Sequence, residues 1–137
     1  MSKELLIFLI DDDTDDQEIF SMIIGDINSR ARVEFAEDGV NALAKLTSLV
    51  QPFVPDLIFI DINMPRMNGI ECLAEIKKLP QLANIPTYMY STSDESFIVA
   101  QSLGVGADGF VKKEANPKEL EARLVNILRD HKLFTHQ

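Results

Sequence analysis

Residues 56–69 constrain the fold of this chain more than any other segment. They include four consecutive apolar residues, 57–60, without polar alternation. Such a run is typical of a strand buried on both faces of a parallel sheet. Asp61 follows directly, and Pro65 with the Asn68-Gly69 pair then predicts a turn. We therefore expect Asp61 near the carboxyl end of a buried strand, where open parallel sheets bind ligands.

The rest of the chain alternates between strand-like and helix-like segments. Predicted strands cover residues 5–10, 32–36, 57–60, 87–91 and 109–112. Predicted helices cover about residues 15–27, 40–50, 69–78 and 97–103, and a last helix begins at Pro117. This alternation predicts an α/β fold with helices on both faces of the sheet. We expect a doubly wound, five-stranded parallel sheet, flavodoxin-like (βα)5, in strand order 2-1-3-4-5. Residues 1–137 are expected to form one domain, with a loosely ordered tail after about residue 132.

Composition and charge narrow the functional classes. No apolar run approaches the roughly 20 residues that a membrane-spanning helix needs, and the N-terminus lacks a signal-peptide pattern. The net charge of −9 argues against direct nucleic-acid binding and suits a protein that holds a cation or meets a basic partner. The single cysteine, Cys72, excludes an internal disulfide and is compatible with a reducing cytoplasm. We therefore expect a cytoplasmic protein that contacts neither nucleic acid nor membrane.

Two groups of acidic residues are expected to meet at one edge of the sheet. Residues 11–13 are aspartates that end the first strand, and Asp61 ends the third. If these strands are neighbours, as in the order above, their carboxylates share the crevice at the topological switch point. Carboxylates so close repel each other unless a cation lies among them, and Mg²⁺ prefers such ligands. The alternative is a solvated acidic rim. Zinc is disfavoured, because both histidines lie in the tail.

Other reactive side chains fall at strand ends on the same edge. The hydroxyl pair Ser91-Thr92 ends the fourth strand, and Lys112 or Lys113 follows the fifth. A metal and an ammonium can neutralise charge on a phosphoryl group while an aspartate attacks phosphorus and forms an acyl phosphate. The combination favours phosphoryl transfer to a carboxylate.

Taken together, these motifs resemble a response-regulator receiver domain of two-component signalling, over essentially the whole chain. The landmarks are Ile10-Asp11-Asp12, Asp56-Leu57 through Asp61-Ile62-Asn63-Met64-Pro65 with Asn68-Gly69, Ser91-Thr92, and Gly106-Ala107-Asp108-Gly109-Phe110 leading to Lys113. Each motif alone is a weak signal, whereas the combination is specific.

The resemblance implies a phosphoacceptor and a metal site. Asp61 would accept the phosphoryl group and contact Mg²⁺ (or Mn²⁺). Asp12 would bind the metal directly, Asp11 largely through water, and the Asn63 backbone carbonyl would be a further ligand. Asp13 has no matching role and is expected to be a helix cap or a solvated acid.

The resemblance also implies a switch. Ser91, next to Thr92, matches the switch hydroxyl, and Phe110 matches the switch aromatic. Lys113, three residues after Phe110, has the spacing of the lysine that contacts the phosphate. Ordinary packing for Phe110 and strand termination for Ser91 are the alternatives.

The implied function is a stand-alone phosphoacceptor switch. A histidine kinase or histidine phosphotransfer protein would donate the phosphoryl group, and binding of another protein, or onward relay, would be the readout. Its only catalysis would be self-phosphorylation and autodephosphorylation. An aspartate-based phosphohydrolase is a second reading, but its acid–base position is occupied here by Asn63, which cannot transfer protons in that way. A flavin or nucleotide carrier is the third, but no glycine-rich loop follows the first strand.

The chain departs from the family pattern directly after the lysine. Family members usually have a proline there, joined by a cis bond, whereas this chain has Glu114 and its next proline is Pro117. A non-proline cis bond costs about 2.5–4 kcal/mol. Because the lysine must still be aimed inward, we expect a cis Lys113–Glu114 bond.

Overall fold

The computed structural model describes residues 4–113 and 116–133, which form five strands and five helices. The strands are β1 Leu6–Ile10, β2 Arg32–Ala36, β3 Leu57–Asp61, β4 Thr87–Ser91 and β5 Gly109–Lys112. The helices are α1 Thr14–Ile27, α2 Gly39–Leu46, α3 Gly69–Lys77, α4 Ser96–Val105 and α5 Pro117–Asp130. None of the helices in the described ranges is long and apolar enough to cross a membrane.

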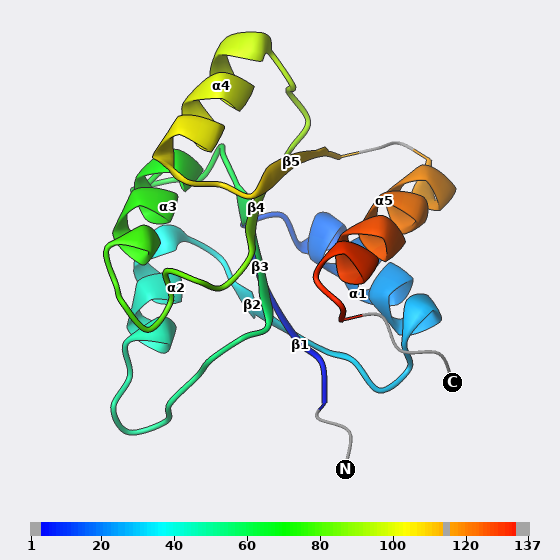
Figure 1. Cartoon of the computed structure of the whole chain (residues 1–137), viewed down its shortest axis with the longest axis horizontal. Coiled ribbons are helices and arrows are strands. Elements are labelled where there is room, and N and C mark those ends of the chain that lie inside the picture. Colours follow the sequence, from blue (N-terminus) through cyan, green and yellow to red (C-terminus); the bar gives the residue numbers. More distant parts are fainter. Residues whose placement is uncertain (1–3, 114–115, 134–137) are drawn as a thin grey trace.

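The strands form one parallel sheet in the order β2-β1-β3-β4-β5. Helices α1 and α5 cover one face, and α2, α3 and α4 cover the other (Figure 1). This arrangement confirms the predicted doubly wound, flavodoxin-like sheet. It leaves the carboxyl ends of the strands open along one edge, which is where ligands bind in such folds.

The central strand β3 is buried on both faces, as its unbroken apolar run predicted. Leu57 and Phe59 belong to the core cluster that includes residues of α1 and α5, whereas Ile58 and Ile60 belong to the cluster that includes residues of α2 and α3. Ile10 of β1 pairs in register with Ile60 of β3. Asp11, which follows β1, and Asp61, which is the last residue of β3, therefore lie side by side at the open edge.

The second helix is shorter than predicted. The apolar spacing predicted a helix that continued to Val50, but α2 ends at Leu46, and Leu49 and Val50 are 95% and 91% exposed. The Thr47 N–H and hydroxyl both donate to the Leu43 carbonyl, and beyond it Ser48 Oγ accepts from the Gln51 N–H. The prediction of a helix over residues 47–50 was wrong, because Leu49 and Val50 do not pack against the core and most helical stability comes from such packing.

Two expectations fall on residues outside the described ranges. The Lys113–Glu114 bond, expected to be cis, involves one of them. The expected loose tail after about residue 132 also lies outside, except for Leu133, which packs against the core beside α5.

Gly69 lets α3 begin directly against the end of β3. Its N–H donates to the Ile62 carbonyl at 2.8 Å. A Cβ at this position would lie 2.2 Å from the Asp61 carbonyl oxygen and 2.7 Å from Ile62 Cα. The neighbouring atoms are backbone, which cannot move aside cheaply. The absence of a side chain at position 69 therefore fixes how closely the helix approaches the acidic edge.

We expect Gly69→Ala to lower the free energy of unfolding by about 1–3 kcal/mol, because the added methyl group overlaps backbone atoms. Gly25→Ala is the matched control, since a Cβ there meets nothing within 4 Å and the residue lies in α1. That control should gain about 0.5–1 kcal/mol. Urea unfolding of both variants measures the difference, and equal stability of the two would contradict the packing argument.

Candidate functional site

Three carboxylates from two neighbouring strand ends gather at the open edge of the sheet. Asp11 and Asp12 follow β1, and Asp61 is the last residue of β3. One oxygen from each carboxylate lies within 4.8 Å of the others. Asp11 is 0% and Asp61 5% exposed, whereas Asp12 is open to solvent. The structure thus brings together the aspartates that the sequence placed on separate strands.

Burial shifts the ionisation of the two inner carboxyl groups. Loss of solvent is the largest influence on Asp61 and raises its pKa to about 6, with Lys113 opposing the shift and the charges of Asp11 and Asp12 adding to it. Burial likewise raises the pKa of Asp11 above its ordinary value, against a hydrogen bond from the Asp13 N–H and the charge of Lys113. The crevice therefore concentrates negative charge where water solvates it poorly.

Lys113 supplies the positive charge of the site. Its Nζ lies 2.9 Å from Asp11 Oδ2, 2.7 Å from Asp16 Oδ2 and 3.6 Å from Asp61 Oδ2. Burial disfavours the ammonium, but its hydrogen bond to Asp16, its close approach to Asp11 and the charge of Asp61 raise the pKa of Lys113 above its ordinary value. Lys112, the alternative in the sequence, points elsewhere and pairs with Asp94 at 3.8 Å.

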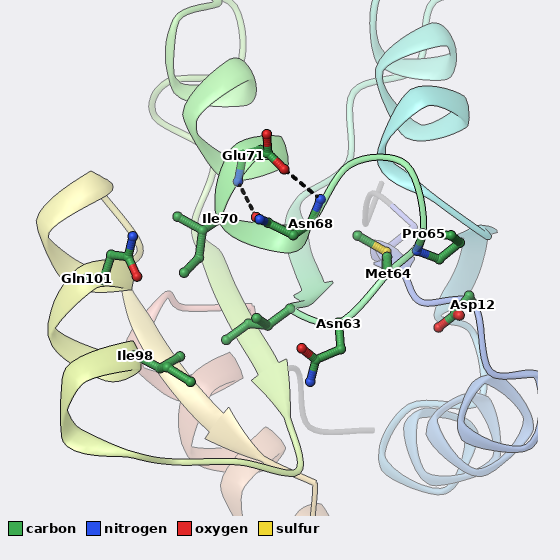
Figure 2. A pocket seen from close by; sticks show the side chains of 10 residues that line it. Asp12, Asn63, Met64, Pro65, Asn68, Ile70, Glu71, Ile98 and Gln101 are labelled. Carbon is green, nitrogen blue, oxygen red and sulfur yellow. Dashed lines mark hydrogen bonds between the residues drawn. The ribbon is translucent and has the colours of Figure 1, made fainter.

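The loop after β3 forms one side of an open pocket of about 570 Å³ next to the carboxylates. Figure 2 shows Asp12 and Asn63 at this pocket, with Ile98 and Gln101 of α4 across from them. The Asn63 N–H donates to Asp61 Oδ1 at 3.4 Å, so the loop follows the carboxylate closely. At the far end of the loop, Asn68 caps α3 through reciprocal bonds with Glu71.

The hydroxyl and aromatic residues lie on β4, which pairs with β3, and on β5, which pairs with β4. Ser91 is buried at the end of β4, and its Oγ accepts from the Ser93 N–H at 3.2 Å, whereas Thr92 is exposed. Phe110 of β5 is half-buried against the core cluster on the α2 and α3 side. The Lys113 N–H donates to the Ser91 carbonyl at 2.7 Å, which joins the hydroxyl and lysine segments.

Sequence reasoning missed two ion pairs that shape the site. Asp16 was not among the candidate site residues, although a helix that starts beside the acidic edge brings its first turn within reach of Lys113. Arg66, in the loop after β3, pairs with the buried Asp38 at the start of α2. The Asn41 N–H bond, together with Arg66, holds the pKa of Asp38 below its ordinary value. Both pairs join residues that are far apart in the sequence, so no local pattern indicates them.

Asp13, by contrast, caps α1 as expected.

The donor set fits a hard divalent cation. All three gathered side chains offer carboxylate oxygens, which such cations prefer. Asp11 Oδ2 is buried and forms no hydrogen bond with any described residue, although it faces the Lys113 ammonium. A buried anionic oxygen without a hydrogen-bond donor is costly, and a metal ion or its bound water would satisfy it.

Comparisons with known proteins agree with this geometry. Residues 7–125 match the response regulator receiver domain family. The chain is 36% identical over 129 residues to the transcriptional regulatory protein CpxR homolog of Haemophilus influenzae, a match that covers 94% of the chain and 51% of the relative. Three curated relatives match the chain over most of its length, and the chain spans between about a third and a half of the length of each relative.

Solved structures show the same likeness. Phosphorylated RcpA, a cyanobacterial phytochrome response regulator, superposes with a TM-score of 0.85 at 28% identity, covering 98% of both chains. The Mn²⁺-bound form of the response regulator Rcp1 superposes with a TM-score of 0.79 at 28% identity, covering 97% of both chains. The chain therefore belongs to the receiver domains of two-component response regulators.

The raised pKa of Asp61 makes a prediction about stability. Its carboxyl titrates at about 6 in the folded protein and at the ordinary value of 3.8 when unfolded. Between these values the folded state holds a proton that the unfolded chain has lost, so the contribution of Asp61 to stability falls as the pH rises from about 4 to 6. In EDTA, Asp61→Asn should therefore raise the free energy of unfolding at pH 7.5 by on the order of 1–3 kcal/mol.

Urea unfolding at pH 7.5 and at pH 4 measures this effect, and the gain should nearly vanish at the lower pH. Asp26→Asn is the control, because Asp26 is an exposed acid on α1 and its replacement should change little at either pH. A gain for Asp61→Asn that is the same at both pH values would show that packing, and not ionisation, is its cause.

Proposed function

We propose that this receiver domain is a phosphoacceptor switch in which Asp61 takes a phosphoryl group from a phosphohistidine. The donor would be a histidine kinase or a histidine phosphotransfer protein. The observation that carries the proposal is the placement of Asp61 within 4.8 Å of two other carboxylates and 3.6 Å from the Lys113 ammonium. A nucleophile, a cation-binding pair and a fixed positive charge thus share one crevice.

In the proposed reaction, a carboxylate oxygen of Asp61 attacks phosphorus and forms a new P–O bond. The P–N bond to the donor histidine breaks, and the imidazole leaves with the electron pair and takes up a proton. Asp61 must be ionised for this step, and with a pKa of about 6 it is mostly ionised at pH 7 even before a cation lowers that value. Lys113 can balance charge on the phosphoryl oxygens.

Asp12, Asp61 and the Asn63 carbonyl are proposed to hold Mg²⁺ or Mn²⁺ directly, with Asp11 acting largely through water. The carboxylate donor set, the buried Asp11 oxygen without a hydrogen bond, and the Mn²⁺ in the Rcp1 structure support this assignment. When bound, the cation supplies charge neutralisation to the phosphoryl group and its attacking oxygen. The amide at position 63 supports an acceptor over a phosphohydrolase, which needs an acid–base residue there.

The proposed readout is a change in the face formed by α4, β5 and α5, to which another protein binds. Ser91 would move toward the phosphoryl group, and Phe110 would turn further inward; Thr92 lies beside Ser91 at the same strand end. Phe97 of α4 is 75% exposed, so this helix offers apolar surface to a partner. Phosphorylation would bias a two-state element through local charge.

We propose protein partners and not nucleic acid or membrane, because the chain carries a net charge of −9. The relatives named as transcriptional regulatory proteins are longer, and the chain matches about half or less of their length. Their names describe those whole proteins. A cytoplasmic location is part of the same proposal, and the buried free cysteine is compatible with it.

Incubation with phosphoramidate and Mg²⁺ should add one phosphoryl group to the wild-type protein, visible by intact mass and lost on treatment with hydroxylamine. Asp61→Asn should abolish the modification, since the nucleophile is gone, and EDTA should do the same. Asp13→Asn is the matched control: asparagine also caps helices well, and Asp13 is not among the gathered carboxylates. Undiminished labelling of Asp61→Asn would place the acceptor elsewhere.

Beryllofluoride with Mg²⁺, which mimics the phosphoryl group, should change amide exchange and chemical shifts in residues 96–112 as well as in the loop after Asp61. Ser91→Ala should retain binding of the mimic but weaken the distant changes, because the hydroxyl that moves toward the phosphoryl group is missing. Changes confined to the loop after Asp61 in the wild-type protein would contradict the proposed readout.

A further inference from the structure

The Lys113 ammonium is shared among three carboxylates, and Asp16 holds it most closely. Its Nζ lies 2.7 Å from Asp16 Oδ2 and donates a hydrogen bond to it. Asp11 Oδ2 lies at 2.9 Å but is not in hydrogen-bond geometry, and Asp61 Oδ2 is farther away at 3.6 Å. The lysine is therefore hydrogen-bonded on the α1 side of the crevice and lies only at ion-pair distance from Asp61.

Asp16 differs from the other partners of Lys113 in its position. Its side chain is 28% exposed, and it is not among the three carboxylates grouped closely enough to share a cation. The start of α1 is nevertheless fixed against the site: the Asp16 N–H donates to Asp13 Oδ1 at 3.2 Å, and Gln17 Nε2 donates to the Asp11 carbonyl at 2.7 Å. Asp16 is thus an anion that lies beside the cluster of Asp11, Asp12 and Asp61 but does not belong to it.

We propose that Asp16 is a positioning residue that restrains Lys113 in the unphosphorylated protein and releases it to the phosphoryl group on Asp61. This inference rests on the proposed function of Asp61 as phosphoacceptor. With a cation held by the cluster of Asp11, Asp12 and Asp61, the ammonium would be less attracted to Asp11 and Asp61, and Asp16 would remain as the anion that retains it. The phosphoryl group then brings about −2 charge beside Asp61 and competes with Asp16 for the same ammonium.

The competition between Asp16 and the phosphoryl group for Lys113 lowers the affinity of the site for the phosphoryl group. Charge-assisted hydrogen bonds are among the stronger ones, so the Asp16 bond must be given up before Lys113 can bond fully to the phosphoryl oxygens. Asp16 therefore weakens phosphorylation, in contrast to the other acids of the site. Removing its charge while keeping its size should favour the phosphorylated form.

The test measures beryllofluoride affinity at saturating Mg²⁺, by calorimetry, for Asp16→Asn and Asp15→Asn. Asp15 is the matched control, because it lies next to Asp16 in the first turn of α1, carries the same charge and is exposed. We expect Asp16→Asn to bind about tenfold more tightly and Asp15→Asn to change little, since only the first loses a bond to Lys113. Equal effects of the two variants, or weaker binding by Asp16→Asn, would overturn the inference.

A double-mutant cycle with Lys113→Gln separates positioning from general charge. If Asp16 acts through the ammonium, its replacement should have no further effect once Lys113 is absent. Persistence of the full tenfold gain in the double variant would show that Asp16 acts by direct repulsion and would also overturn the inference. Asp16→Glu, which retains a carboxylate, should restore affinity close to that of the wild-type protein.

A second measurement does not depend on phosphorylation. In ¹⁵N-edited spectra, the Lys113 ammonium signal should shift in Asp16→Asn and remain in place in Asp15→Asn. An unchanged signal in Asp16→Asn overturns the inference whether or not Asp61 accepts phosphate. Failure of the wild-type protein both to bind beryllofluoride and to be labelled by phosphoramidate would instead overturn the proposed function of Asp61.

Discussion

The structure depends on a compromise between burial and charge at the carboxyl ends of β1 and β3. The register that pairs Ile10 with Ile60 delivers Asp11 and Asp61 side by side into a place with little solvent. Two buried carboxylates so near each other are costly unless opposite charge is supplied. Lys113 supplies part of it from the end of β5, and the remainder suits a divalent cation, which the oxygen donors favour.

The surrounding fold holds this unfavourable arrangement by ordinary local interactions. Asp13 caps α1 and thereby fixes the turn that carries Asp16, while Asn68 and Glu71 cap α3 at the end of the loop after β3. Gly69 lets that helix start against the backbone of β3. These caps use the side chains of Asp13, Asn68 and Glu71, so they stabilise the edge without engaging the carboxylates of Asp11, Asp12 and Asp61.

A lysine with three carboxylate partners can respond to small changes in its surroundings. The ammonium lies within 2.7–3.6 Å of Asp16, Asp11 and Asp61, so a change of charge on any one of them alters its best position. In the proposed function, a cation and a phosphoryl group change that charge in turn. The backbone of Lys113 is bonded to the Ser91 carbonyl, which offers a direct connection from the lysine to the hydroxyl segment at the end of β4.

The sequence by itself determined the alternation of strands and helices and the residues that end each strand, whereas the strand order was expected by analogy with a known fold. The first two features depend on local patterns: unbroken apolar runs for buried strands, and polar residues where the runs end. It failed at the end of α2, because the spacing of Leu49 and Val50 suits a helix, but these side chains are exposed and no packing extends the helix to them. Only the tertiary structure decided that Asp16 anchors Lys113 and that Arg66 pairs with Asp38. The physical reason is that an ion pair depends on distance in space, and these partners are separated by 97 and 28 residues along the chain.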